Sequence, residues 1–311
     1  MTSNTRYEEI VVCLYDGEYH LGVGALINSL AKFKFKGLVN IGYRGGNLPA
    51  WVSQLKPISD SYFNVTEEIA IHFKVVDTKM HLGYFKPFFI RDTFETFPTV
   101  KKVYYFDVDI LIHAPWDMFS NWLQNGICLC LDSSFHFLHH THPWRKHWRA
   151  LANRDESLQN NTDQYFNSGF IGIENGNAEI IDRWINITNN FINNDGDVKR
   201  FVKNLHIPVR GDQDLLNAAI TVSADIDCNI MGKEAMGFSL PPTLMLHAIG
   251  ERKPWNSSFF IHLLSYGNKP SMSDKLFLTF CEYPIRVFSP FDYALKKIDL
   301  LIACFFGRFL S

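Results

Sequence analysis

Apolar runs and amphipathic stretches alternate along the first part of the chain. The run EEIVVCLYD ends at Asp16, residues 21–32 have helical spacing, and a second apolar run covers residues 37–43. Strand, helix and strand in this order predict a βαβ unit, whose parallel strands are buried on both faces. The pattern then predicts a helix over 47–55 and a strand over 71–76.

The middle of the chain continues this alternation around an acidic triplet. We expect a helix that begins at Lys86-Pro87 and runs to Thr96, because proline is tolerated best in a first helical turn. An aromatic strand over 102–106 follows and stops at Asp107-Val108-Asp109. The class predicted is α/β. Further elements are expected as strands over 127–131 and 166–173 and as helices over 177–193 and 212–220.

The composition changes near residue 268, beyond which strand-like runs no longer alternate with helices. We expect a main domain over 1–267 and a small helical appendage over 268–311. The closing stretch 293–311 places Lys296, Lys297 and Arg308 among apolar residues. It is too short to cross a bilayer, so it predicts either a helix lying in a membrane interface or one docked on the main domain.

Composition and charge narrow the class of protein. Hydrophobic residues make up 47% and charged residues 20% of 311 residues, which excludes a largely disordered chain. Lys and Arg number 30 against 32 Asp and Glu, so no basic excess points to nucleic-acid binding. The six cysteines lie mostly in apolar runs, and we find no secretion leader and no run of 18 apolar residues. We therefore expect a cytoplasmic protein. Peripheral contact with the cytoplasmic face of a membrane is compatible with this expectation.

The clearest chemical signal is the pair Asp107 and Asp109 directly after a buried strand. Ligands of α/β sheets bind beyond the carboxyl ends of strands, which is where this pair falls. A turn at that point brings both carboxylates to one hard cation such as Mg²⁺ or Mn²⁺. The alternative is that acids follow a strand merely because the chain emerges into water.

Three further motifs carry polar groups that fit an anionic ligand, although each also has a purely structural interpretation. In HAIGERKPW, His247 offers a metal ligand, Gly250 a close backbone approach and Lys253 a cation for phosphate. Asp212 and Gln213 open a helix, where an acid also serves the helix dipole. The third motif is Asn167-Ser168 within FNSGF, where glycine in an apparent strand marks a close approach.

These motifs occur in the order DVD, FNSGF, GDQDLLN and HAIGERKPW, and in this order the chain resembles the family 8 glycosyltransferases over residues 1 to about 260. That family includes the glycogenins and bacterial lipooligosaccharide galactosyltransferases. The resemblance implies the GT-A fold, a Rossmann-like nucleotide-diphospho-sugar transferase with a mixed sheet flanked by helices. It also implies a retaining, metal-dependent reaction that uses a UDP-sugar.

The resemblance assigns the metal and the nucleotide base to five residues. Asp107 and Asp109, with His247 as the third ligand, would bind Mn²⁺, with Mg²⁺ as the alternative ion. Asp107 would also lie near the ribose. Asp16 and Tyr19 match positions that hold the base, although Glu18 stands between them where bacterial members often have asparagine.

Five other residues match the positions around the donor sugar. Lys86 would face the sugar and the phosphates, and Asn167 and Ser168 would line the sugar. Asp212 would bind its hydroxyls. Gln213 would lie on the reactive face, and because a neutral amide is a poor nucleophile, we favour stabilisation of an oxocarbenium-like state by its carbonyl dipole. Attack on the same face and a covalent intermediate both remain open.

The remaining matched residues, Gly250 and Lys253, would hold the diphosphate, where Lys253 adds positive charge as the phosphate departs. We expect transfer of galactose or glucose to a glycan or lipid-linked oligosaccharide. The irregular stretch 135–148 is a candidate acceptor loop, with Trp144 or Trp148 stacking on a sugar. Alternatives are a nucleotidyltransferase, which should show a basic glycine-rich loop after the first strand, and a non-catalytic sugar-binding module, which needs no metal.

Overall fold

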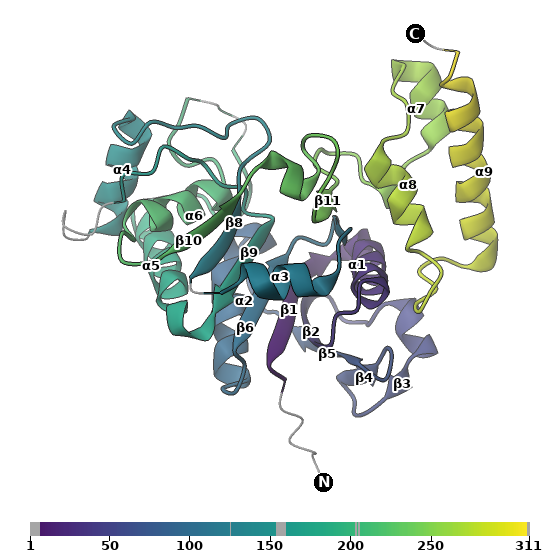
Figure 1. The fold of residues 1–311 in the computed structure, drawn as a ribbon, viewed down its shortest axis with the longest axis horizontal. Helices are drawn as coiled ribbons and strands as arrows, with labels where there is room; N and C mark the ends of the chain where they lie inside the picture. Colours follow the sequence, from purple (N-terminus) through teal and green to yellow (C-terminus); the bar gives the residue numbers. More distant parts are fainter. Residues whose placement is uncertain (1–6, 125, 154–159, 203, 205, 310–311) are drawn as a thin grey trace.

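A computed structural model of the chain describes residues 7–124, 126–153, 160–202, 204 and 206–309. Its centre is a twisted sheet with helices packed on both faces, and three helices at the end of the chain stand to one side (Figure 1). The strand order is β10-β8-β9-β6-β1-β2-β5-β4-β3. The order of elements along the chain explains how this sheet forms.

The predicted βαβ unit lies in the middle of the sheet. Strand β1 (Glu9–Asp16) is followed by α1 (His20–Lys32) and by β2 (Gly37–Arg44), which pairs parallel with β1. Strand β5 (Ile69–Val75) extends the parallel arrangement beside β2, and β6 (Lys102–Phe106) does so on the other side of β1. The carboxyl ends of these four strands therefore share one edge of the sheet.

The outer strands make the sheet mixed. Strand β9 (Phe170–Glu174) lies antiparallel between β6 and β8 (Ile127–Cys130), and β10 (Cys228–Met231) pairs parallel with β8. On the opposite side, β4 (Tyr62–Asn64) and β3 (Lys56–Pro57) add short antiparallel edges. A separate antiparallel pair joins β7 (Ile110–Ile112) to β11 (Met245–His247).

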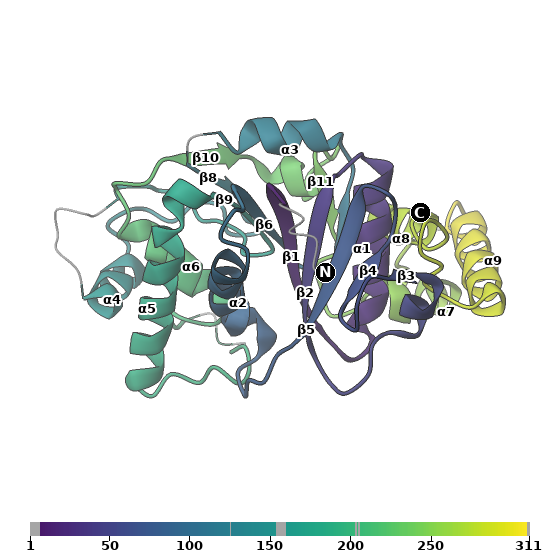
Figure 2. The same ribbon diagram turned by 90° about the horizontal axis from the view of Figure 1, so that it is seen from below.

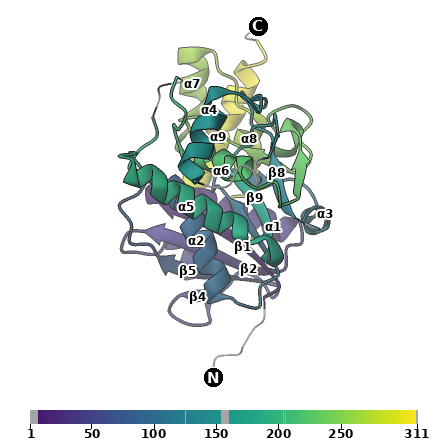
Figure 3. The same cartoon turned by 90° about the vertical axis from the view of Figure 1, so that its left-hand side faces the viewer.

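Alternate side chains of β1 enter two different hydrophobic cores. Val11 and Cys13 pack with α1 and with α3 (Trp116–Trp122) on one face, and Val12 packs on the other. All three are fully buried, as expected for a central parallel strand. The second face is covered by α2 (Leu82–Thr96), α4 (Pro143–Ala152), α5 (Glu179–Asn193) and α6 (Asp212–Thr221) (Figures 2 and 3).

The three C-terminal helices are held by specific polar contacts. Helix α9 (Pro290–Phe306) docks on α7 (Phe259–Tyr266), because the Asp299 carboxylate accepts the backbone N–H groups of Phe259 and Phe260 at 2.6 and 3.1 Å. Helix α8 (Met272–Thr279) and the loop after it lie against α1. None of the helices in the described ranges combines the length and the apolar character needed to cross a bilayer.

Two expected helices are different in the structure. The region 47–55 is only a short 3₁₀ turn, Ala50–Gln54, because Pro49 and Pro57 leave no room for a longer helix. Helix α2 begins at Leu82 and not at Lys86, since the His81 side chain caps it by accepting the N–H of Gly83. Pro87 therefore lies inside this helix.

The predictions for two other stretches were also wrong. The region 135–148 is not wholly irregular: His142 caps α4, and Arg145 and Trp148 are buried at helical spacing. The strand expected over 166–173 starts only at Phe170, since the chain turns at Asn167, whose side chain accepts the N–H of Gly169 at 2.9 Å.

Candidate active site

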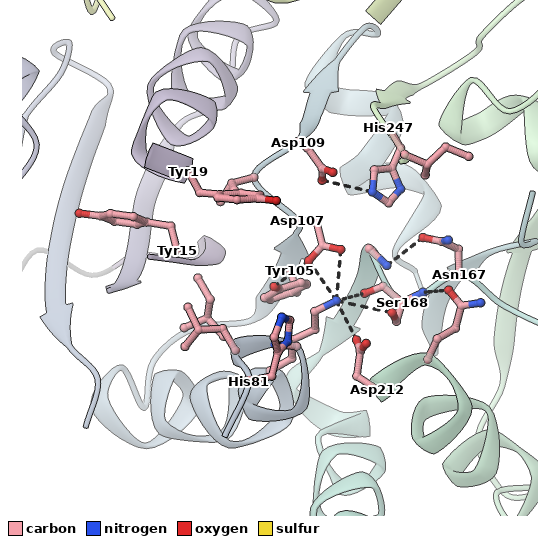
Figure 4. A pocket seen from close by; sticks show the side chains of 18 of the residues that line it. Tyr15, Tyr19, His81, Tyr105, Asp107, Asp109, Asn167, Ser168, Asp212 and His247 are labelled. Atoms are coloured by element: carbon pink, nitrogen blue, oxygen red, sulfur yellow. Dashed lines mark hydrogen bonds and ion pairs between the residues drawn. The ribbon is translucent and has the colours of Figure 1, made fainter. Parts of the chain in front are cut away.

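A cavity of about 500 Å³ opens at the edge where β1 and β6 end (Figure 4). Its walls come from the ends of β1, β6 and β11 and from the first turns of α2 and α6. All twelve residues expected to bind the metal or the donor line this one cavity. They are Asp16, Tyr19, Lys86, Asp107, Asp109, Asn167, Ser168, Asp212, Gln213, His247, Gly250 and Lys253.

The direction of β9 explains why Asn167 and Ser168 lie beside Asp107. Phe170, the first residue of β9, pairs with Phe106, the last of β6, because the two strands run antiparallel. The Asp107 N–H then donates to the Gly169 carbonyl at 2.7 Å. The start of one strand and the end of its neighbour thus meet at the same edge.

The pairing of β7 with β11 brings His247 to the acidic pair. His247 pairs with Ile110, and the Ala248 N–H donates to the Asp109 carbonyl at 2.9 Å. His247 Nε2 lies 3.2 Å from Asp109 Oδ1, and one ligand atom from each of Asp107, Asp109 and His247 lies within 4.8 Å of the others. Two carboxylates and an imidazole, with His247 Nδ1 buried and without a hydrogen-bond partner among the described residues, fit a divalent cation that keeps open positions.

Asp109 is held as a carboxylate. Burial alone would raise the pKa of this group, but His247 and Lys253 outweigh that effect and hold its pKa well below the usual range. Lys253 Nζ donates to Asp109 Oδ2 at 2.5 Å and to the Ala248 carbonyl at 2.9 Å. Lys253 and Asp109 thus form an ion pair in the lining of the cavity.

Lys86 is a buried cation at the floor of the cavity, with 5% of its side chain exposed. Its Nζ lies 3.0 Å from Asp107 Oδ1 and 2.8 Å from Asp212 Oδ2, and it donates to the Ser168 carbonyl at 3.1 Å. Burial would lower the pKa of Lys86, but the two carboxylates outweigh this and raise it. One positive charge thus joins three separate segments of the site.

Asp132, which was not expected from the sequence, orients two of the predicted residues. Its Oδ1 accepts from Asn167 Nδ2 at 3.0 Å and from Gln213 Nε2 at 3.1 Å. Gln213 Oε1 accepts the Ser168 N–H at 3.2 Å, so both ends of the Gln213 amide are fixed. Asp132 comes shortly after β8, and the same signal that singled out Asp107, an acid following a buried strand, could have identified it.

The opposite end of the cavity is open and aromatic. Tyr19 is 38% exposed, and its ring contacts the Trp255 ring edge-on, with ring centres 5.2 Å apart. Asp16 lies 3.6 Å from Arg44, an exposed ion pair. Gly250 has φ of +109° with no heavy atom within 4 Å of an added Cβ, so strain and not space disfavours a side chain there.

The interpretation of 135–148 as an acceptor loop fails for Trp148. This side chain is fully buried, and its Nε1 donates to the Pro208 carbonyl at 2.7 Å. Trp144 is half-buried and packs against Phe135 and the Arg210 guanidinium. Neither tryptophan lines the cavity.

No protein-family model matches the chain, and no curated protein matches it either. Several solved structures, in contrast, match the chain in fold. An apo structure of the bifunctional glycosyltransferase WbbM is 16% identical with a TM-score of 0.53, covering 96% of this chain, which spans about half, 52%, of the WbbM chain.

Two structures of the galactosyltransferase LgtC match over nearly their whole length. One, in complex with donor and acceptor sugar analogues, is 13% identical with a TM-score of 0.51, and the other, an active-site mutant, is 13% identical with a TM-score of 0.54. Each covers 92% of this chain and 99% of its own. The expected GT-A glycosyltransferase fold, with a mixed sheet flanked by helices and a helical C-terminal segment, is confirmed. At these identities the likeness establishes the fold alone.

Proposed function

We propose that the protein is a retaining, Mn²⁺-dependent glycosyltransferase that moves a hexose from a UDP-sugar to a glycan or lipid-linked oligosaccharide. The observation that carries this proposal is the gathering of all twelve expected residues around one cavity, with the ligand atoms of Asp107, Asp109 and His247 within 4.8 Å of one another. Mg²⁺ is the alternative ion. Galactose and glucose are the first donors to test, since the LgtC structures are those of a galactosyltransferase.

In this proposal the cavity divides between nucleotide and sugar. Asp16 and Tyr19 hold the base at the open end, and Gly250 and Lys253 hold the diphosphate. A bound cation would neutralise charge on the departing phosphate. Lys253 adds a fixed positive charge at the same place, which lowers the free energy of the transition state. At the floor, Asp212, which is paired with Lys86, would accept hydrogen bonds from sugar hydroxyls.

The transfer breaks the bond between the sugar C1 and the phosphate oxygen and forms one between C1 and an acceptor hydroxyl on the same face. The hydroxyl proton passes to the departing phosphate oxygen, and UDP leaves. Asn167 and Ser168 line the sugar during this step. Gln213 is held by Asp132 and Ser168, so its amide dipole would act on the reactive face without reorganisation during the reaction.

Release of UDP from a panel of UDP-sugars, with and without Mn²⁺, tests the proposal. Wild type should hydrolyse one donor slowly in the presence of Mn²⁺, and Asp109→Ala should not. Asp117→Ala, which removes an acid outside the cavity, serves as the matched control. Failure of every donor together with no UDP binding by calorimetry would overturn the proposal and favour a sugar-binding module. Formation of a sugar nucleotide from a sugar phosphate and UTP would instead show a nucleotidyltransferase.

The acceptor side of the proposal includes contact with a membrane through 293–311, of which Leu310 and Ser311 lie outside the described residues. Leu300 and Ala303 are buried against the protein, whereas Leu301, Phe305 and Phe309 on the same segment are 54 to 72% exposed. Residues 259–311 carry six basic and four acidic side chains, whereas the net charge of the whole chain is −2. An exposed apolar face with a basic surplus suits an anionic bilayer.

Co-sedimentation with phosphatidylglycerol vesicles tests that contact. We expect binding by wild type, weaker binding by Leu301→Asn with Phe305→Ser, and little binding of either to phosphatidylcholine. Both substituted side chains are exposed, so the fold should be unaffected. Equal sedimentation of wild type and the double variant would contradict a membrane role for this face.

A further inference from the structure

One exposed aromatic ring lines the cavity without any role in the donor site. Phe201 is 45% exposed and belongs to the segment that crosses between α5 and α6. Exposed phenylalanines elsewhere on the surface are common and carry no meaning by themselves. Phe201 differs because the surrounding backbone holds it in place at the mouth of a polar cavity.

Two backbone hydrogen bonds fix the chain on either side of Phe201. The His81 N–H donates to the Val198 carbonyl at 2.8 Å, and the Val202 N–H donates to the Arg210 carbonyl at 2.8 Å. His81 precedes α2 and Arg210 nearly adjoins α6. The segment is therefore tied to the first turns of both helices that supply Lys86 and Asp212.

Two glycines make room for the ring. A Cβ at Gly83, in the first turn of α2, would lie 2.6 Å from Phe201 Cζ, and one at Gly211, which caps α6, would lie 3.1 Å from Cδ1. The His81 ring also packs against Phe201, with ring centres 4.2 Å apart. The edge of Phe201 is thus held by its neighbours.

We propose that Phe201 is the apolar platform on which the acceptor sugar lies. This inference rests on the proposed glycosyltransferase function and adds the residue that selects its acceptor. Most donor positions are charged or polar, as a nucleotide diphosphate requires, and the one exposed aromatic ring among them, Tyr19, is assigned to the nucleotide base. A pyranose ring has an apolar face of C–H groups that packs on an aromatic ring, while its hydroxyls face polar groups of a binding site.

Steady-state kinetics in which the donor KM and the acceptor KM are measured separately test this role. With methyl β-galactoside and methyl β-glucoside as acceptors, Phe201→Ala should raise the acceptor KM roughly five- to tenfold, the loss of one aromatic contact. Phe201→Tyr should keep the wild-type value, and Phe201→Leu, which fills space without a flat ring, should behave like alanine. The donor KM and the rate of UDP release without acceptor should not change. Phe291→Ala, an exposed phenylalanine on α9, is the matched control.

Two results would overturn the proposal: an unchanged acceptor KM in Phe201→Ala, or an equal rise in the donor KM, which would place the ring in the donor site. Saturation-transfer NMR with the same glycosides, with UDP and Mn²⁺ present, separates failure of the platform from failure of the enzyme. If wild type cleaves no donor but the glycoside signal still depends on Phe201, the binding role stands and the proposed reaction falls. If the glycoside signal is equal in wild type and Phe201→Ala, the proposed role of Phe201 in acceptor binding is wrong.

Discussion

Lys86 and Asp212 form a buried ion pair, with Nζ 2.8 Å from Oδ2 and both side chains less than a tenth exposed. Removing one partner of such a pair leaves an uncompensated charge in a medium of low dielectric. Lys86→Met should therefore lower the free energy of unfolding by about 3 kcal/mol, measured by urea denaturation. Lys74→Met, which breaks the half-exposed ion pair with Asp92, should cost less than about 1 kcal/mol. Equal losses of unfolding free energy in the two variants would contradict the conclusion that burial makes the Lys86–Asp212 pair costlier to break.

Gly169→Ala should weaken metal binding. An added Cβ would lie 2.5 Å from His247 Cε1 and 2.9 Å from Asn167 Oδ1, so the imidazole must shift from its present position. We expect the dissociation constant for Mn²⁺, followed by electron paramagnetic resonance, to rise about tenfold or more. Gly176→Ala, where an added Cβ meets no atom within 4 Å, should leave it unchanged.

Asp132→Ala should slow turnover without weakening nucleotide binding. The substitution removes the carboxylate oxygen that accepts from both Asn167 and Gln213, so the Gln213 amide loses its fixed orientation. A misplaced group at a reacting centre can cost about a hundredfold in rate. We expect kcat to fall about tenfold to a hundredfold and the Kd for UDP to stay constant. Asp163→Ala, which removes an acid outside the cavity, is the control, and a parallel loss of UDP affinity would refute a positioning role.

His72 should make stability depend on pH. Burial, helped by Lys74, lowers the pKa of this imidazole from 6.5 to about 4. Between these values the unfolded chain binds a proton that the folded protein does not, so stability is present above pH 6.5 and is lost as the pH falls. From pH 7 to 5 this group should cost about 1 kcal/mol after allowance for the solvent that reaches the ring. Urea titrations should show a shallower pH dependence for His72→Phe, and identical slopes would count against the buried neutral imidazole.

Asn28→Ala should loosen the C-terminal helices. The fully buried Asn28 donates to the carbonyls of Phe280 and Ile285 and accepts the Ile285 N–H, at 2.7 to 2.8 Å. Three buried backbone groups would lose their partner, at a cost of about 2–3 kcal/mol. Limited proteolysis should then cut first within 268–290. Ser53→Ala, which removes an exposed local hydrogen bond, should not change the cleavage pattern.

Much of the fold could be predicted because its central strands are buried on both faces. The apolar runs that end at Asp16 and Asp107 could be recognised without any knowledge of their partners. The reversal of β9 could not, since an antiparallel and a parallel buried strand have the same apolar pattern. The sequence interpretation consequently extended this strand through Asn167 and Ser168, which belong to the turn before it.

The candidate site could be predicted, as far as a position in the cavity, where a residue type and its place at a strand or helix end agreed, as for Asp107 and Asp212. It was not predictable where the role depends on a contact across the fold. Phe201 is an ordinary aromatic in a polar stretch until the glycines at 83 and 211 make room for it. Trp148 was misjudged for the converse reason, because its burial at helical spacing is masked by neighbouring histidines.

The pairing of β11 with β7 has a consequence for the order of events during synthesis. Asp107 and Asp109 leave the ribosome well before His247, and a domain folds as a unit. The proposed cation site would therefore assemble only after β11 has emerged and paired with β7. A nascent chain cut short before residue 247 would lack both His247 and Lys253, and we expect it to bind Mn²⁺ far more weakly than the full-length protein.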